Sequence, residues 1–189
     1  MIRKPTQKRA LETFERLLDA AGFLIEELGV ERISTNLIAA RAGVSPPTLY
    51  HYFTDKYALL AALGERLMAA QNALVAMDMA GGGSDIEQVL LDHVTVTRAS
   101  PGGPWVMRML RAVPQLAEIR LASHREVSAA LADRMQELDP AQARATLERR
   151  ARLAVDLGYA AIELVFDEPG LDDRAVMADA ARAIRALQA

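Results

Sequence analysis

The sequence predicts an all-α protein, and three observations support this fold class. About half of the residues are apolar (51%), a quarter are charged (25%) and only 5% are aromatic, a mixture rich in strong helix formers. Apolar side chains recur at steps of three and four along most of the chain, which is the period of an amphipathic helix. Glycines, prolines and capping residues separate these stretches. With 189 residues, the chain is long enough for a small helical domain joined to a larger one.

The first helix is predicted from a single apolar face near the N-terminus. The members of this face are Leu11, Phe14, Leu18, Ala21, Ile25 and Leu28. Gly29 ends the helix, because glycine readily adopts the left-handed conformation that follows many helices. The basic side chains before this face are Arg3, Lys4, Lys8 and Arg9. They form an arm that either contacts DNA phosphates or remains a solvated tail.

Two short helices are predicted next, with a tight turn between them. Ser34 is an N-cap for a helix that ends at Gly43, and Ser45 is an N-cap for a second helix that continues to about Tyr52. Pro46 falls at the first position of this second helix, where its missing N–H does no harm. Gly43 has no Cβ to oppose the left-handed conformation that such a turn needs.

The spacing of side chains divides this helix pair into an inner and an outer face. We expect the inner face to hold Ile38, Ala39, Ala42, Val44, Leu49 and Phe53. We expect the outer face to hold Pro46, Pro47, Thr48, Tyr50, His51 and Tyr52. Hydroxyl and imidazole groups on a short exposed helix suit phosphates and base edges in the DNA major groove. For Tyr50, a place at the edge of the core is an equally good interpretation.

Longer helices follow, separated by clear breaks. Asp55 caps a helix that ends before the glycine run 81–83, and Ser84 with Glu87 forms a capping box for a helix from Asp85 to about Ala99. The breaker run 101–104 precedes a short helix over 105–112. A longer helix then carries Leu116, Ile119, Val127, Leu131 and Met135 on its apolar side.

The last two helices are predicted over about 141–166 and 172–187, and the turn 167–170 divides them. Asp139, followed by Pro140 and Gln142, provides the start of the first of these helices. Small residues between larger apolar ones allow close helix packing, which suits either a core or a subunit interface.

The most informative segment is ERLLDAAGFLIEELGVERISTNLIAARAGVSPPTLYHYFTDKYALLAAL, residues 15–63. It resembles the DNA-binding domain of the TetR family of bacterial repressors. The resemblance lies in the ordered series I-A-x-x-A-G-V-S, a variable pair, T-L-Y-x-Y-F, and then a lysine before an apolar pair. It implies about nine helices: a helix-turn-helix DNA-binding domain over 1–56, and a larger helical domain over 57–189 for ligand binding and dimerisation.

The resemblance also implies a function and its residues. It implies a homodimeric repressor that binds a palindromic operator in double-stranded DNA and is released by a small apolar or amphipathic ligand. The alternative is a DNA-binding regulator whose C-terminal domain serves dimerisation or a protein partner, with no small-molecule ligand. The implied DNA contacts are Thr35, Asn36, Pro46, Pro47, Thr48, Tyr50, His51 and Lys56.

Two further residue sets are expected in the larger domain. Methionine, aromatic and histidine side chains suit an apolar ligand, although core packing is the competing explanation for most of them. The candidate ligand-binding residues are His93, Trp105, Met109 and Tyr159. The resemblance places dimerisation on the last two helices. The candidate interface residues are Leu153, Leu157, Ala161, Ile162, Val165, Val176, Ala180 and Ile184.

Composition excludes several other classes of protein. The absence of cysteine rules out disulfides and thiolate metal sites, and no catalytic or metal-binding motif is visible, so we expect no enzyme, metal or cofactor. No run of eighteen apolar residues appears, and we expect a cytoplasmic protein without a membrane span. The net charge is −3, but residues 1–60 hold eight Lys and Arg against seven Asp and Glu, which leaves the DNA-binding segment slightly positive.

Overall fold

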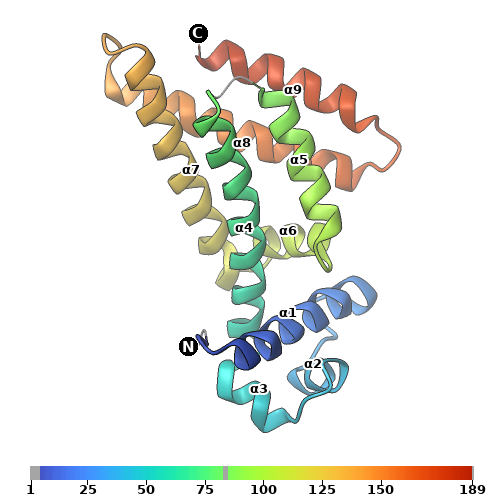
Figure 1. The fold of residues 1–189 in the computed structure, drawn as a ribbon. Coiled ribbons are helices and arrows are strands. Elements are labelled where there is room, and N and C mark those ends of the chain that lie inside the picture. The colour runs from blue at the N-terminus through green and yellow to red at the C-terminus, as the bar shows by residue number, and fades with distance from the viewer. Residues whose placement is uncertain (1–4, 83–84, 189) are drawn as a thin grey trace. The chain divides into compact units, whose positions relative to one another are not determined.

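The computed structural model describes residues 5–82 and 85–188, and within them the chain is all-α, as predicted. The described residues form nine α-helices and one 3-10 turn (Figure 1). The elements are α1 (Lys8–Leu28), α2 (Thr35–Arg41), α3 (Pro46–Tyr52), α4 (Lys56–Ala80), α5 (Ile86–Ala99), α6 (Gly103–Ala112), η1 (Pro114–Leu116), α7 (Ala117–Leu138), α8 (Arg144–Asp167) and α9 (Asp173–Gln188). The expected cap at Ser84 lies outside the described residues. None of the described helices combines the length and the apolar character needed to cross a membrane.

Contacts divide the chain into two compact units. One unit comprises Met1–Met68 with Arg98–Arg120, and the other comprises Ala69–Thr97 with Leu121–Ala189. The division passes through α4, so this helix contributes its first part to one unit and its last part to the other. The domain boundary expected after residue 56 stays a prediction.

The first unit is built around α1. The predicted apolar face of this helix is buried at Phe14, Leu18 and Ile25, while Leu11 at its first turn is exposed. The ring of Phe14 lies 5.0 Å from the ring of Phe53, measured between centroids. Aromatic pairs at this separation add to the stability given by area burial. The short helices that follow α1 are therefore fixed to it through a shared core.

A backbone contact joins α1 to the turn before α6 in the same unit. A Cβ added at Gly22 would lie 2.2 Å from the carbonyl oxygen of Pro101, and one added at Gly102 would lie 2.1 Å from the carbonyl oxygen of Gly22. Gly102 also has a φ of 65°, in the left-handed region. Only glycine fits at either position, because any side chain would overlap the opposing backbone.

The second unit contains a helical core formed by α7, α8 and neighbouring helices. Helix α9 packs along α8 after a short turn (Figure 1). One buried cluster joins Ala132 and Met135 of α7 to Leu147 and Ala151 of α8. Helix α8 begins at Arg144, slightly later than expected, because Asp139 closes a turn instead: its carboxylate accepts from the backbone N–H of Ala141 at 3.2 Å.

Candidate nucleic-acid interface and ligand pocket

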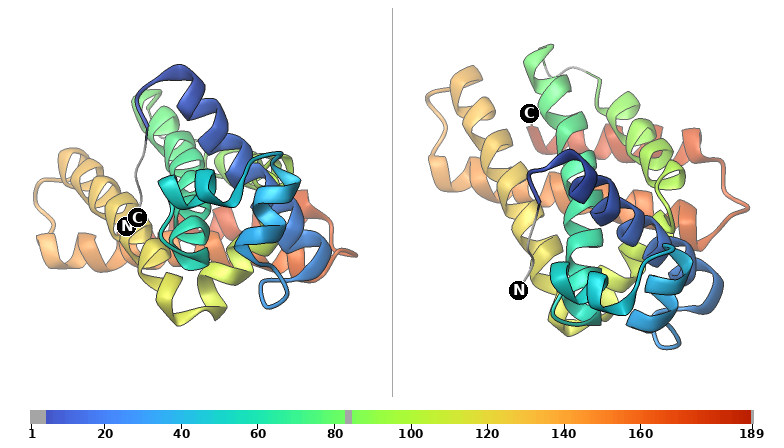
Figure 2. Two further views of the ribbon diagram at one scale, coloured as in Figure 1. Left: turned by 90° about the horizontal axis from the view of Figure 1, so that it is seen from below. Right: turned by 60° about the horizontal axis from the view of Figure 1, so that its bottom comes forward.

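Helices α2 and α3 are capped at their N-termini as the sequence predicts. The hydroxyl of Ser34 accepts from the backbone N–H of Leu37 at 3.3 Å, and that of Ser45 accepts from the N–H of Thr48 at 3.4 Å. Gly43, in the turn between the helices, has a φ of 67°. Figure 2 shows α2 and α3 following one another through this turn. The predicted helix, turn and helix are thus present.

The inner face of the pair agrees with the sequence prediction, apart from partial exposure at one position. Ile38, Ala39, Ala42, Leu49 and Phe53 are buried, and Val44 is half-buried.

Tyr52 is a correction to the predicted outer face. It is only 7% exposed, and its ring packs edge-on against Phe14 with the centroids 6.0 Å apart. The cause is helical spacing, because Tyr52 follows Leu49 by three residues and so faces the same core.

The remaining outer-face residues lie at the surface of α2 and α3. Asn36, Pro46, Pro47, Tyr50 and His51 are exposed, and Thr35 and Thr48 are half-buried. The side chain of Tyr50 is 51% exposed, and its hydroxyl lies 2.9 Å from the hydroxyl of Thr35. This hydrogen bond links α3 to the first residue of α2. Contact with DNA stays a prediction for all seven residues.

Lys56 lies at the start of α4 beside the same surface. Its ammonium donates to the backbone carbonyl of Val30 at 3.2 Å, so this cation is already held in place by the backbone. Asp55 caps the helix by accepting from the N–H of Ala58 at 2.8 Å, and this bond lowers the pKa of the Asp55 carboxyl. A shallow surface hollow is lined by Ile33, Ser34, Thr35, Tyr50, Thr54, Asp55 and Lys56.

The hollow brings together three predicted contact residues and adds two hydroxyls that the prediction omitted, Ser34 and Thr54. The sequence analysis identified Ser34 as an N-cap and did not consider it as a surface hydroxyl. In the basic arm, Lys8 and Arg9 are exposed at the start of α1, while residues 3 and 4 lie outside the described residues.

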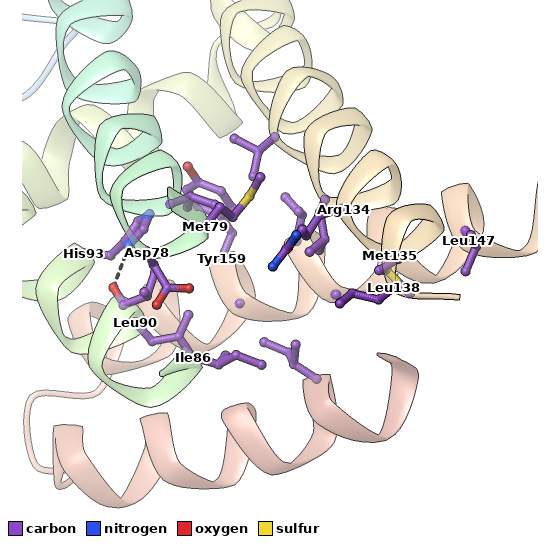
Figure 3. Close-up of a pocket in the computed structure, with 18 of the residues that line it drawn as sticks. Asp78, Met79, Ile86, Leu90, His93, Arg134, Met135, Leu138, Leu147 and Tyr159 are labelled. Carbon is purple, nitrogen blue, oxygen red and sulfur yellow. Dashed lines mark hydrogen bonds between the residues drawn. The ribbon is translucent and has the colours of Figure 1, made fainter. Parts of the chain in front are cut away.

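The second candidate site is a pocket inside the second unit, with a cavity volume of about 210 Å³ (Figure 3). Its lining is mostly apolar. The residues that line it are Val75, Asp78, Met79, Gly82, Ile86, Val89, Leu90, His93, Val127, Leu131, Arg134, Met135, Leu138, Asp139, Gln142, Leu147, Ala154, Val155, Gly158, Tyr159, Ile162 and Ile184.

Two of the four predicted ligand-binding residues line this pocket and two do not. His93 of α5 and Tyr159 of α8 form part of its wall. Trp105 and Met109 belong to α6 in the other unit. There Met109 is buried in the core. Trp105 is exposed, and the guanidinium carbon of Arg108 lies over its ring, 4.9 Å from the centroid. Sequence spacing could not separate these pairs, because the difference lies in which unit each helix joins.

The ring of His93 is held by one backbone hydrogen bond. Its Nδ1 lies 2.7 Å from the carbonyl oxygen of Val89, one helical turn earlier (Figure 3). A carbonyl oxygen can only accept, so Nδ1 carries the hydrogen and donates it. Burial lowers the pKa of His93, although this hydrogen bond and the charge of Asp92 act in the opposite direction. The imidazole is therefore neutral at pH 7, and its Nε2 is a hydrogen-bond acceptor.

Tyr159 packs between two histidine rings. It stacks on His124 with the centroids 4.1 Å apart, and it meets His93 edge to face at 6.1 Å. Burial raises the pKa of Tyr159 to about 12, so its hydroxyl stays protonated. That hydroxyl is enclosed without a well-formed hydrogen bond, although the Ser123 hydroxyl is close enough to lower its pKa slightly.

An ion-paired chain orients the His124 ring behind Tyr159. Its Nδ1 lies 2.7 Å from the carboxylate of Asp156, which also accepts from Arg152 at 2.8 Å. Burial alone would raise the pKa of Asp156, but the hydrogen bonds from Arg152 and His124 outweigh it and lower that pKa. The wall formed by Tyr159 is thus fixed by side chains on two helices.

The predicted dimer residues differ in their accessibility. Leu153 is 51% exposed, and Leu157 and Val176 are half-buried. The others, Ala161, Ile162, Val165, Ala180 and Ile184, are buried within a single chain, and Ile162 and Ile184 line the pocket. Burial makes these five poor candidates for contact with a second copy. The sequence prediction omitted Leu164, which is 43% exposed and follows Leu153 by eleven residues, on the same side of α8.

Two short capped helices, joined by a glycine turn and packed on a third helix, define a helix-turn-helix protein. A profile of the N-terminal domain of the bacterial regulatory proteins of the tetR family matches residues 17–63. Residues 17–63 of the chain therefore form a helix-turn-helix domain of the TetR family of bacterial regulatory proteins.

Individual relatives match over part of the chain. The Escherichia coli tetracycline repressor protein class A from transposon 1721 is 43% identical over 53 residues, which cover 28% of this chain and 24% of the repressor. An uncharacterized HTH-type transcriptional regulator of Mycobacterium bovis is 31% identical over 99 residues, which cover 52% of this chain and 50% of that protein. The chain thus spans half or less of the length of these curated relatives.

Solved structures share the fold over nearly the whole chain. Salmonella enterica GusR has a TM-score of 0.72 at 22% identity, covering 98% of this chain and 99% of GusR. A complex of SmeT with triclosan has a TM-score of 0.69 at 22% identity, covering 91% of each chain. A tetR-family transcriptional regulator from Streptomyces coelicolor has a TM-score of 0.72 at 20% identity, covering 93% of this chain and 80% of that one. At these identities the likeness concerns the fold alone.

Proposed function

We propose that the protein is a repressor that binds a palindromic operator as a homodimer in the cytoplasm and leaves the operator when a small molecule enters the pocket of the second unit. The observation that carries the proposal is the division of α3 into two faces. Leu49 and Tyr52 anchor this helix in the core, while Pro46, Pro47 and Tyr50 face outward. A short helix anchored in this way can enter the major groove, which is about 12 Å wide.

The chemistry of the exposed face supports DNA as the partner. Tyr50 and His51 can donate to phosphate oxygens or base edges, and Asn36 has the amide that reads adenine bidentately. The two prolines remove backbone donors from the start of α3 and leave apolar carbon that suits a thymine methyl group. Specificity in this proposal therefore rests on side chains rather than on backbone N–H groups.

A second copy is the proposed partner for the outer face of α8. Leu153, Leu157 and Leu164 give that face an exposed or half-buried apolar stripe in a helix that is otherwise well packed. An exposed apolar stripe of this kind is costly for a solvated monomer and suits a twofold interface. A dimer would also contain two α3 helices, and helix-turn-helix dimers use two such helices to bind two half-sites.

Ligand control is the third part of the proposal. The pocket is enclosed mainly by apolar side chains with a few polar ones, which is the usual composition of a small-molecule site. SmeT, which shares the fold, is known as a complex with triclosan. The dimer has a form that binds DNA and a form that does not. A ligand would release the operator only to the extent that it prefers the form that does not bind DNA.

Selection of DNA from a random library tests the DNA-binding part. Binding is measured at two salt concentrations, because phosphate contacts release counterions and make affinity fall steeply with salt. We expect recovery of a palindromic sequence that is bound more tightly than the starting pool. Equal binding of all sequences would contradict sequence-specific regulation. Selective binding that no small molecule reverses would favour the alternative, in which the second unit serves only dimerisation or a protein partner.

A further inference from the structure

The pocket of the second unit contains a polar atom whose hydrogen-bonding capacity is unused. Among the described residues, the side chain of His93 makes a single hydrogen bond, from Nδ1 to the backbone of Val89. Its Nε2 is left as an acceptor in a side chain that is only 3% exposed and that lines the cavity. An acceptor in so enclosed a side chain is poorly solvated, so the site gains from a molecule that supplies a donor.

The surroundings of Nε2 determine what else that molecule must offer. The walls near His93 are formed by Met79, Ile86, Leu90 and the ring of Tyr159, with Asp78 beside them (Figure 3). Apolar walls favour an apolar body because its burial removes apolar surface from water. The volume of about 210 Å³ exceeds the roughly 150 Å³ of an apolar cavity that accommodates benzene. The ligand can therefore be somewhat larger than one unsubstituted ring.

The charged groups of the lining disfavour an ionic ligand. Asp78 and Asp139 contribute two carboxylates and Arg134 one guanidinium. Arg134 is paired with Glu137 at 3.1 Å through Nη1, and although its buried Nε has no partner, this single cation is outnumbered by the two carboxylates that would repel a ligand anion. An anion would also meet the lone pair of Nε2. A cation would lose its water on entering a mostly apolar cavity, and the carboxylate of Asp78 beside His93 would offset only part of that loss.

We propose that this pocket takes an uncharged, largely apolar molecule of about one substituted ring, whose hydroxyl donates a hydrogen bond to Nε2 of His93 beside the ring of Tyr159. The inference rests on the proposed function, since it specifies the ligand class of the same pocket. A hydroxyl suits this end because it is a donor that carries no charge to desolvate. The rigid backing of Tyr159 by His124 keeps the apolar wall in place while the ligand binds.

Four probes with the same apolar body separate the possible head groups. They are 4-tert-butylphenol, its methyl ether, the corresponding benzoate and the corresponding benzylammonium. Binding to the full chain is measured by calorimetry at pH 7.5. We expect the phenol to bind about tenfold more tightly than the ether, since the ether has a methyl group in place of the donor, which is worth about 1.5 kcal/mol. We expect the two ions to bind more weakly than the phenol.

Variants of His93 assign the difference to one atom. In His93→Phe, the phenol and the ether are expected to bind equally, because the acceptor is gone while the volume is filled. His93→Gln restores an acceptor and should recover part of the preference for the phenol. Thr95→Val is the matched control, because Thr95 is exposed on the same helix and does not line the pocket. The phenol-to-ether ratio should be unchanged in this control.

The outcomes distinguish this inference from the proposed function. Equal binding of phenol and ether to the unmodified chain, tighter binding of either ion, or no binding of any probe would overturn the ligand class, and none of these results needs a variant that folds. Release of the selected DNA is measured in parallel. If the phenol binds with the expected preference but the DNA stays bound, the ligand class holds and ligand-controlled release fails.

Discussion

The surface of α2 and α3 and the pocket of the second unit present polar groups in opposite ways. On the α2–α3 surface, Tyr50 and His51 are exposed to water and can turn toward a partner. In the pocket, His93 is buried and its ring is fixed by the backbone of Val89. Exposed donors lose little when unbound, so they suit a large polar partner whose affinity comes from many weak contacts. A fixed buried acceptor suits one small molecule with one matching donor.

The difference shows where specificity can reside in each region. On the proposed DNA-binding surface, specificity would be distributed over several side chains, so we expect that no single substitution abolishes binding. On the pocket side, one atom sets the class of ligand. Mutations in the two regions should therefore differ in kind.

The largest effect is expected for charge placed on the outer face of α8. Burial of one leucine side chain at the interface contributes about 1.5–3 kcal/mol to the free energy of dimerisation. In a twofold dimer each leucine occurs twice, once in each copy. The double variant Leu153→Arg with Leu164→Arg should raise the dimer dissociation constant by more than about a hundredfold, as measured by sedimentation. The control is Leu11→Arg with Met77→Arg, which adds the same charge at other exposed apolar residues. Variants that remain dimeric would place the interface elsewhere and remove the link between dimerisation and α8.

The next effect concerns the backbone contact that holds α1 in the first unit. Gly22→Ala places a methyl group 2.2 Å from the carbonyl oxygen of Pro101, so one segment must move. Overpacking of this kind costs about 1–3 kcal/mol. We expect a lower thermal midpoint and weaker DNA binding, since α1 supports α2 and α3. Gly170→Ala is the control because nothing lies within 4 Å of the new methyl group. An equal effect of the two substitutions would show that the close approach is unimportant.

Sequence reasoning succeeded where local signals determine the structure. The caps at Ser34 and Ser45 and the turn at Gly43 depend on residues within a few positions of one another, so they could be predicted. Tyr52 was wrongly predicted to lie on the outer face, because that face was assumed to include every residue from Tyr50 to Tyr52.

The pocket was harder to predict, because its walls come from helices far apart in the sequence. His93 was recognised as unusual in an apolar stretch, whereas Trp105 was grouped with it only by composition. The dimer prediction relied on apolar spacing along α8 and α9, and spacing alone does not separate the side of a helix that faces its own core from the side that faces a partner. Ile162 and Leu164 are two residues apart, yet one lines the pocket and the other is exposed.

A smaller effect is expected from the loss of one hydroxyl on α3. Tyr50→Phe removes the group that bonds to Thr35 and that we propose for a phosphate contact. A hydrogen bond to a charged group is worth about 1.5–3 kcal/mol, so operator affinity should fall at least about tenfold with the dimer intact. Fluorescence anisotropy with the selected DNA measures this. Tyr57→Phe, at another exposed tyrosine, is the control. Unchanged affinity of Tyr50→Phe would remove this hydroxyl from the interface.

The smallest effect concerns pH and the buried histidine. Burial holds the pKa of His93 below its unfolded value of about 6.5. As the pH falls below that value, the unfolded chain gains a proton that the folded chain does not accept, so stability is lost progressively until the pH passes the folded pKa. His93→Gln should reduce the loss of thermal stability between pH 7 and pH 5.5. The groups that face His93 (Asp78, Asp92, Arg134 and Tyr159) are unchanged in this variant, so the difference between the two profiles isolates His93. Identical profiles would contradict burial of a neutral imidazole.

Footprinting of the selected DNA with hydroxyl radicals tests most directly whether α3 is the reading element of a symmetric dimer. We predict two protected clusters on one face of the duplex, with centres about 10 base pairs or one helical turn apart. In Tyr50→Phe, both clusters should weaken together, because each copy of the chain presents the same surface. A single protected cluster, or two clusters on opposite faces of the duplex, would contradict binding by a symmetric dimer that contacts DNA through α3.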